Sequence, residues 1–142
     1  KWVMTQEDKN LLLKDLCARL PYGVKAIGNY STNCCSVVDT IEGIFYNNYV
    51  GIDGCNFDIS NIQLYLFPLS NMTEEIMDEI YEESGVYDID VDSSFYIEAG
   101  TTFEDLTKIS NILHKHHIDY RNLIQKGLAI DATGLNIYWL WF

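Results

Sequence analysis

The sequence predicts a single α+β domain spanning residues 1–142, and two observations support this prediction. Apolar residues recur at helical spacing towards both ends of the chain, whereas β-forming runs separated by turn-forming residues fill the region between them. The chain has 142 residues, of which 48% are hydrophobic, and this suits one domain with a sizeable core. We therefore expect an N-terminal helix over 5–20, a β-rich part over 22–67, a mainly helical part over 73–127 and an apolar tail over 135–142.

The N-terminal helix is predicted from leucines that recur at helical spacing. They form one apolar stripe of Leu12, Leu13, Leu16 and Leu20, opposite Lys9, Lys14 and Asp15. Thr5 stands at the expected N-cap, where its hydroxyl can accept from the backbone N–H near Asp8, and acidic residues suit the positive end of a helix. Pro21 is expected to end this helix.

Short β-forming runs follow the first helix. They cover residues 23–27, 35–41, 44–46, 49–52 and 62–67. Gly43 and the pair Asp53-Gly54 are among the turn-forming residues between them, and Asp-Gly is a strong hairpin signal. Four or five short strands in so few residues predict a small SH3-like β-barrel or a bent antiparallel sheet.

Two further helices are predicted in the C-terminal half of the chain. Thr73 is expected to cap one of them and Gly85 to end it, with an apolar side made of Ile76, Met77, Ile80 and Tyr81. Thr102 is expected to cap the other, with Asp105 three residues later and an apolar face made of Leu106, Ile109, Ile112, Leu113 and His116. Between the two helices, residues 86–97 alternate loosely and suit either a strand or an acidic loop.

The last quarter of the chain predicts a short fourth helix and a packed tail. Asp119 is expected to cap a helix over 120–126, which Gly127 closes in the C′ position. The tail over 135–142 is apolar to its last residue, and left exposed it would favour aggregation. We expect a final strand or lid that packs on the domain, and a contact with a second copy or a partner is the alternative.

The distribution of charge is the strongest physical signal in the chain. No lysine or arginine occurs between Lys25 and Lys108, whereas residues 26–107 contain sixteen carboxylates. The whole chain has a formal net charge of -12 at pH 7. A surface of one sign cannot neutralise itself with internal ion pairs, so it repels itself, binds cations or faces a basic partner.

The candidate partner-binding residues are chosen mainly from this acidic region. They are Glu74, Glu75, Asp78, Glu79, Glu82, Glu83, Asp88, Asp90 and Asp92, with Asp119, Tyr120 and Arg121 as a further contact point. The competing interpretations are ordinary ones: an acidic face that keeps the protein soluble, and an aspartate that caps a helix beside a buried tyrosine.

Two clusters suggest a metal site at first sight, and neither predicts one. Asp88, Asp90 and Asp92 resemble the start of a calcium loop, but Ser93 replaces the glycine that an EF-hand needs at its sixth position and Ala99 replaces the glutamate at its twelfth. The three histidines within residues 114–117 lack the three or four ligands of a zinc site, and positive charge suits the end of a helix. We predict neither a metal nor a cofactor.

Catalysis and direct nucleic-acid binding are both disfavoured. The chain contains no Gly-x-Ser-x-Gly elbow, no phosphate-binding loop with Lys-Ser/Thr and no dinucleotide Gly-x-Gly-x-x-Gly motif. Adjacent glutamates such as Glu74 and Glu75 suit a solvated helix face better than acid–base catalysis. The net charge of -12 opposes binding to phosphates, so we predict a protein without enzymatic activity that does not bind nucleic acid directly.

The sequence predicts a cytoplasmic protein without a membrane segment. No stretch approaches the roughly 18 apolar residues that cross a bilayer, and the N-terminus turns acidic where a signal peptide is apolar. The cysteines form no Cys-x-x-Cys motif, which indicates reduced, buried thiols; they are Cys17, Cys34, Cys35 and Cys55.

Three blocks of the sequence resemble a family of small uncharacterised proteins from gut Bacteroides and their phages or prophages. The blocks are MTQEDKNLLLKDLCARLPYGVK at 4–25, YLFPLSNMTEE at 65–75 and HIDYRNLIQKGLAIDATGLNIY at 117–138. The resemblance implies a bacterial or phage origin and a cytosolic location, and it implies no catalytic residues. Members of this family ordinarily end near Tyr138, so residues 139–142 depart from its pattern.

Three functional hypotheses follow from these features. The first is a non-enzymatic accessory protein of a phage or mobile element that binds a protein through its acidic surface, with a basic or nucleic-acid-binding protein as the candidate partner. The second is a small-molecule or nucleotide-binding module that uses the barrel. The third is a virion or oligomeric structural protein that associates through the apolar tail at 138–142.

Overall fold

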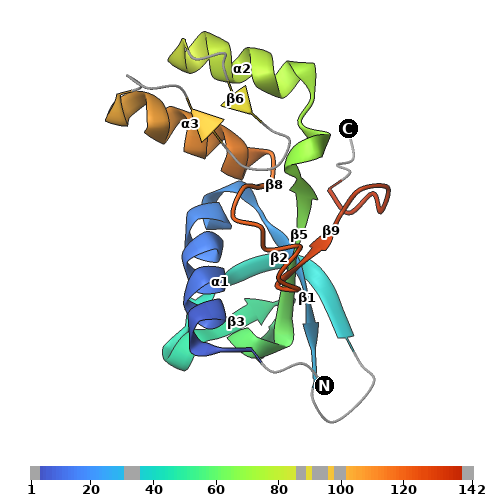
Figure 1. Cartoon of the computed structure of the whole chain (residues 1–142). Coiled ribbons are helices and arrows are strands. Elements are labelled where there is room, and N and C mark those ends of the chain that lie inside the picture. Colours follow the sequence, from blue (N-terminus) through green and yellow to red (C-terminus); the bar gives the residue numbers. More distant parts are fainter. Residues whose placement is uncertain (1–3, 31–35, 86–88, 91–95, 98–101, 139–142) are drawn as a thin grey trace.

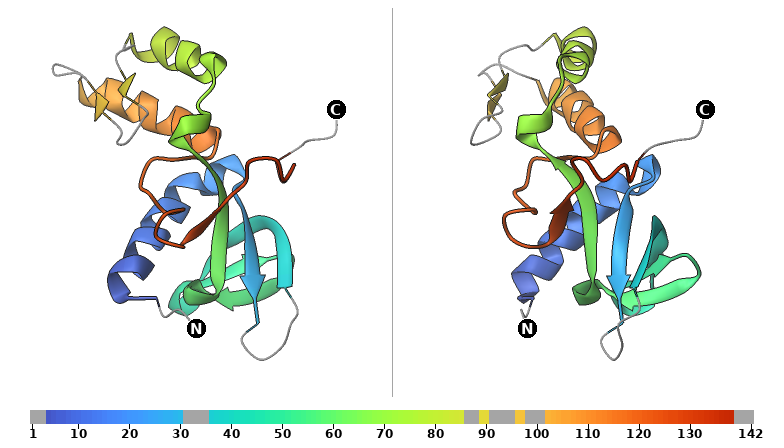
Figure 2. Two further views of the ribbon diagram at one scale, coloured as in Figure 1. Left: turned by 45° about the vertical axis from the view of Figure 1, so that its right-hand side comes forward. Right: turned by 90° about the vertical axis from the view of Figure 1, so that its right-hand side faces the viewer.

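The computed structural model describes residues 4–30, 36–85, 89–90, 96–97 and 102–138. Within these residues the protein is a mixed α+β fold with three α-helices and a seven-stranded, mostly antiparallel open sheet (Figure 1). The predicted α+β class is confirmed. In the views of Figure 2, α1 lies along the sheet, whereas α2 and α3 lie together beyond one end of it.

The first helix forms where its leucines and its cap predict it. Helix α1 spans Gln6–Arg19 and begins with a capping box, in which Thr5 Oγ1 accepts from the Asp8 N–H at 3.1 Å and Asp8 Oδ2 accepts from the Thr5 N–H at 3.4 Å. Leu12 and Leu16 are fully buried in the main core. The helix therefore packs its leucine stripe against the inner side of the sheet.

The strands follow one another through an antiparallel meander before the chain adds two parallel strands. The sheet has the order β4-β3-β2-β1-β5-β8, and β9 also pairs with β5. Neighbours among β1 to β5 are antiparallel, whereas β8 and β9 run parallel to β5. The strands are β1 Lys25–Asn29, β2 Ser36–Phe45, β3 Tyr49–Ile52, β4 Cys55–Asp58, β5 Ile62–Pro68, β8 Ile118–Asp119 and β9 Ala129–Asp131.

Two details of the predicted strands are wrong and one is confirmed. No turn divides β2 at Gly43. The pairing of β2 with β3 continues past this residue, with a register shift between Ile41 and Gly43. The hairpin at Asp53-Gly54 forms, with φ of 50° and 76° at the two turn residues. Strand β4, which follows this hairpin, was missed because Asn and Asp are poor strand formers.

One glycine allows β4 to pack closely over β1. A Cβ atom added to Gly28 of β1 would lie 2.6 Å from Cδ2 of the Phe57 ring, which is too close for any side chain. The same ring contacts Tyr30, with ring centroids 4.8 Å apart. The strand pair at one edge of the sheet therefore folds back over β1, and Phe57 becomes part of the main core.

The two remaining helices build a second, smaller core. Helix α2 spans Glu74–Ser84 and α3 spans Phe103–Lys115, and threonine side chains cap both helices as predicted. Their apolar sides meet in a cluster of Ile76, Ile80, Ile109, Ile112, Leu113 and Ile118. Between them β6 Ile89–Asp90 and β7 Tyr96–Ile97 form a two-stranded sheet, so the part over 73–127 is not helical throughout.

The predicted fourth helix is wrong, although its expected caps are in place. Residues 120–122 are irregular and residues 123–127 form hydrogen-bonded turns, because Asn122 has a φ of 59° and interrupts any continuous helix. Gly127, at a φ of 76°, closes the turn: its N–H donates to Ile124 O, and the Leu128 N–H donates to Leu123 O. The chain then enters β9 directly.

The described part of the C-terminal tail packs on the domain. The Tyr138 hydroxyl donates to Tyr65 O at 2.6 Å and accepts from the Lys25 N–H at 2.8 Å. Its ring stacks on His117, with ring centroids 3.9 Å apart. Residues 139–142 of the predicted tail lie outside the described residues.

Candidate functional site

Helix α2 directs most of its predicted binding residues to solvent. Its apolar side packs on α3, and the carboxylates that project from the other side form what we call the acidic face of α2. This face consists of the exposed residues Glu74, Glu75, Asp78, Glu82 and Glu83. Within the described part of the chain, none of them forms an ion pair.

Glu79 differs from the other acidic residues of α2 because it joins the two helices. Its carboxylate contacts Lys115 Nζ and His116 Nε2, both at 2.8 Å. The hydrogen bond from Lys115 lowers the pKa of Glu79, and the same bond raises the pKa of Lys115. Lys115 and His116 at the end of α3 thereby hold α2, and Lys115 also attracts Glu83 without an ion pair. The acidic face itself forms no ion pair within the described residues.

The remaining predicted acidic residues cannot be placed on a common surface. Asp88 and Asp92 lie outside the described residues, and Asp90 belongs to β6 although its side chain is not described. Among the residues that are described, no group of three or more His, Cys, Asp and Glu side chains could hold a metal ion.

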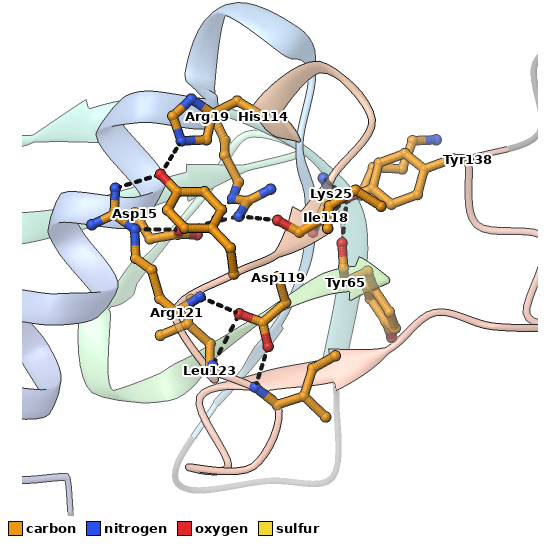
Figure 3. A network of polar contacts seen from close by, with 12 residues as sticks. Asp15, Arg19, Lys25, Tyr65, His114, Ile118, Asp119, Arg121, Leu123 and Tyr138 are labelled. Atoms are coloured by element: carbon orange, nitrogen blue, oxygen red, sulfur yellow. Dashed lines mark hydrogen bonds and ion pairs between the residues drawn. The ribbon is translucent and has the colours of Figure 1, made fainter. Parts of the chain in front are cut away.

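The segment from Asp119 to Arg121 lies in a different place, at the junction of α1 and α3 (Figure 3). The buried Asp119 carboxylate accepts three backbone N–H groups, from Arg121 at 3.2 Å, Leu123 at 3.0 Å and Ile124 at 2.9 Å. The expected capping role is therefore present, on a turn instead of a helix. Asp119 and α2 do not form one site.

A buried ion pair on α1 lies beside this segment, and the sequence analysis misplaced it. Asp15 was expected on the polar side of the helix, yet both Asp15 and Arg19 are 0% exposed. Arg19 Nε donates to Asp15 Oδ2 at 2.7 Å, and Arg19 Nη2 donates to Ile118 O at 2.6 Å. The spacing of four residues between an aspartate and an arginine was the available signal.

Arg121 extends this pair into a network that also includes a tyrosine and a histidine. Arg121 Nε lies 3.1 Å from Asp15 Oδ1, a distance suited to an ion pair although the N–H is not aligned for a hydrogen bond. Arg121 Nη2 donates to the Tyr120 hydroxyl at 2.8 Å, and this hydroxyl lies 2.6 Å from His114 Nε2. Figure 3 shows the Arg19 and Arg121 side chains beside the Asp15 side chain.

The protonation state of His114 follows from its surroundings. Burial, reinforced by the positive charges of Arg19 and Arg121, lowers the pKa of His114 to about 4. The imidazole is therefore neutral at pH 7. Because the Tyr120 oxygen already accepts from Arg121, the consistent arrangement has the Tyr120 hydroxyl donating to His114 Nε2.

The network is arranged for stability. Two aspartates and two arginines cancel one another: Asp15, Asp119, Arg19 and Arg121. The contacts join α1, the end of α3 and the segment after it, and they bury the charges of Asp15 and Arg19 completely. A buried, internally neutralised network of this kind specifies how elements pack, whereas a binding surface needs charges that remain available.

Comparison of the chain with protein-family models, with curated proteins and with solved structures finds no match. No helix among the described residues has the length and apolar character needed to span a membrane. Function must therefore be inferred from the residues and their geometry.

Proposed function

We propose that this protein has no enzymatic activity of its own and acts by binding a basic protein through the acidic face of α2. The observation that carries the proposal is the pairing pattern of this helix. Glu79 is neutralised by Lys115 and also contacts His116, while the five exposed carboxylates of the acidic face have no ion pair within the described residues. The opposite side of the helix packs on α3, and the residues of the acidic face are exposed. Figure 1 shows α2 at one end of the molecule, next to α3.

Electrostatics favours a basic partner for this surface. Carboxylates three or four residues apart on a helix repel one another, and lysine or arginine side chains of a partner would relieve that repulsion. Such a surface also accelerates encounter with a positively charged protein, an effect that falls as salt rises. A protein that normally binds nucleic acid fits this description, because its phosphate-binding surface is basic.

The resemblance to Bacteroides phage and prophage proteins supports a cytoplasmic accessory role in a phage or mobile element. We also propose a finer fold for the β-rich part, an SH3-like barrel. The strand order β4-β3-β2-β1-β5 and the packing of Phe57 over Gly28 support a sheet that curves towards closure. The proposed binding surface lies on α2, outside this part.

The test is affinity purification of the tagged protein from a Bacteroides lysate at low and at high salt, followed by mass spectrometry. The variant Asp78→Asn/Glu82→Gln/Glu83→Gln removes three charges from the acidic face and leaves the Glu79 contacts intact. The matched control Glu7→Gln/Asp39→Asn/Asp53→Asn removes three exposed carboxylates from other elements, and Asn-Gly at the last position still suits the β3–β4 turn.

We expect the native chain and the control variant to retain the same basic protein at low salt and to release it at high salt. The α2 variant should lose this protein at both salt concentrations. Equal retention by all three chains would refute the acidic face as the contact surface. Recovery of the chain alone would instead favour the alternatives, self-assembly or binding of a small-molecule ligand.

A further inference from the structure

A hollow at the opposite end of the molecule from α2 has a composition unlike the rest of the protein. Its volume is 510 Å³, within the range of sites that bind small molecules. It lies where the end of β1, the start of β5 and the turn before β9 meet. The residues that line it include Asn29, Tyr30, Asn61, Gln63, Gln125 and Lys126.

The lining of this hollow is free of negative charge although the chain carries a net charge of -12. None of the described lining residues is an aspartate or glutamate, and Lys126 brings the single charge among them. Lys126 is exposed and forms no ion pair within the described residues. A carboxylate does lie next to the lining, that of Asp58, but it accepts from the Ser60 N–H and the Ser60 hydroxyl. The lining itself therefore offers one cation and no carboxylate to an anionic group.

Four carboxamide side chains give the hollow its hydrogen-bonding capacity. Gln63 Nε2 donates to Gly127 O at 2.9 Å, and this bond ties β5 to the turn and holds one wall in place. The carboxamides of Asn29, Asn61 and Gln125 form no hydrogen bond within the described part of the chain. Each offers a donor and an acceptor side by side, the pattern that reads the edge of a nucleobase.

An aromatic and an apolar side chain complete the lining. The Tyr30 ring is held against the buried Phe57 ring and remains 37% exposed, so a flat ligand can contact it. Met4 adds an adaptable apolar surface. Stacking of a base on an aromatic ring stabilises a complex and tolerates any base.

We propose that this hollow binds a nucleoside monophosphate, with the base against Tyr30 and the carboxamides and the phosphate beside Lys126. The volume suits one nucleotide, and the Lys126 ammonium group is available to its phosphate. A nucleic-acid strand is a poorer ligand, because the field of a chain with a net charge of -12 repels a polyanion. The site is separate from the acidic face of α2 and requires no partner protein.

The test is a titration of the purified chain, followed by amide chemical shifts, with AMP, GMP, CMP and UMP as ligands. Adenosine lacks the phosphate and ribose 5-phosphate lacks the base, so these two compounds separate the two halves of the site. We expect saturable shifts with at least one nucleotide. Its nucleoside should bind about tenfold more weakly, because a charge-assisted contact is lost, and ribose 5-phosphate should bind weakest.

Variants locate the site. Lys126→Ala should weaken nucleotide binding about tenfold and leave nucleoside binding unchanged, while Asn61→Ala should weaken both. Lys14→Ala, which removes an exposed lysine from α1, is the matched control and should change neither. Unchanged melting temperatures would show that the variants are folded.

Three outcomes would overturn the proposal. They are the absence of saturable binding with all four nucleotides, binding of ribose 5-phosphate as tight as that of the nucleotides, and nucleotide binding that Lys126→Ala and Asn61→Ala both leave intact. The second outcome would show an anion site without base recognition, and the third would place the ligand elsewhere on the chain.

Discussion

The buried network at the end of α1 and the acidic face of α2 are both rich in charge, and they use it in opposite ways. Asp15 and Arg19 are 0% exposed, and their charges are neutralised by each other and by Arg121. The other carboxylates of α2 are exposed, and within the described residues only Glu79 forms an ion pair, although Lys115 also attracts Glu83. The charges of the buried network are paired within the protein, whereas those of the acidic face of α2 remain available to a partner.

This difference separates a structural role from a binding role. Taking a charge out of water costs several kcal/mol, so a buried charge is tolerated only where its partners are in place, and the partners therefore determine how elements pack. Exposed charges cost little to keep and contribute little to the free energy of unfolding. Stability should therefore depend on the network, and association on α2.

The largest expected effect is the loss of Arg19. Arg19→Leu leaves the Asp15 carboxylate buried with Arg121 alone and removes the donor to Ile118 O. We expect the free energy of unfolding to fall by about 3–5 kcal/mol, the usual consequence of removing one member of a buried pair. Urea unfolding followed by circular dichroism measures this loss.

The matched control for Arg19→Leu is Lys14→Leu, which removes an exposed cation from the same helix. Its free energy of unfolding should lie within about 0.5 kcal/mol of the native value. Equal losses in the two variants would contradict the structural role of the network.

The pH dependence of stability tests the two buried histidines of this region. Burial is the main cause that lowers the pKa of both His114 and His117 to about 4, from an ordinary value of 6.5. Between these values the unfolded chain binds more protons than the folded chain, so the free energy of unfolding should fall as pH falls from 6.5 to 4. The loss should reach up to about 3 kcal/mol for each histidine, and above pH 7 it should vanish.

The variant His114→Gln separates this effect from the titration of carboxylates. Glutamine can still accept from Tyr120 but does not titrate. The decrease in the free energy of unfolding between pH 6.5 and 4 should therefore be smaller in this variant by the contribution of His114. Chemical unfolding at a series of pH values checks this. A profile parallel to that of the native chain would show that His114 is protonated in the folded state.

A smaller effect is expected at the C-terminal contact. Tyr138→Phe keeps the ring that stacks on His117 but leaves the Lys25 N–H and Tyr65 O without their shared hydroxyl. An unsatisfied polar group costs about 1–3 kcal/mol, so the free energy of unfolding should fall by that amount. Tyr46→Phe, at a side chain that is 87% exposed, is the control and should change nothing measurable. Thermal unfolding of both variants measures this difference. Equal stability of the two variants would contradict the packing of Tyr138 on the domain.

The sequence predicted local features of this protein well and contacts between distant segments poorly. The threonine caps, the leucine stripe of α1 and the Asp53-Gly54 hairpin depend on residues close in the chain, and the structure confirms each of them. The network depends on Arg19 meeting Ile118, ninety-nine residues away, and no local pattern contains that information. For the same reason Asp15 was assigned to solvent.

The sequence predicted the acidic residues of α2, but it did not predict that Glu79 alone among them would form ion pairs with α3. A run of glutamates shows a charged helix, but the separation of Glu79 from its neighbours arises only because Lys115 and His116 arrive from α3. The hollow beside Lys126 likewise combines residues from four separate segments. Both sites therefore required the tertiary structure.

The smallest expected effect on stability, and the sharpest contrast with Arg19→Leu, belongs to the variant Asp78→Asn/Glu82→Gln/Glu83→Gln. Like charges three or four residues apart destabilise a helix by about 0.2–0.5 kcal/mol per pair, and glutamates near its C-terminal end oppose the helix dipole. Removing three of these charges should therefore raise the free energy of unfolding by a few tenths of a kcal/mol, and more at low salt than at high salt. Urea unfolding at two salt concentrations measures it. A loss of more than about 1 kcal/mol would mean that these carboxylates have partners within the fold, and the acidic face would then be structural like the network.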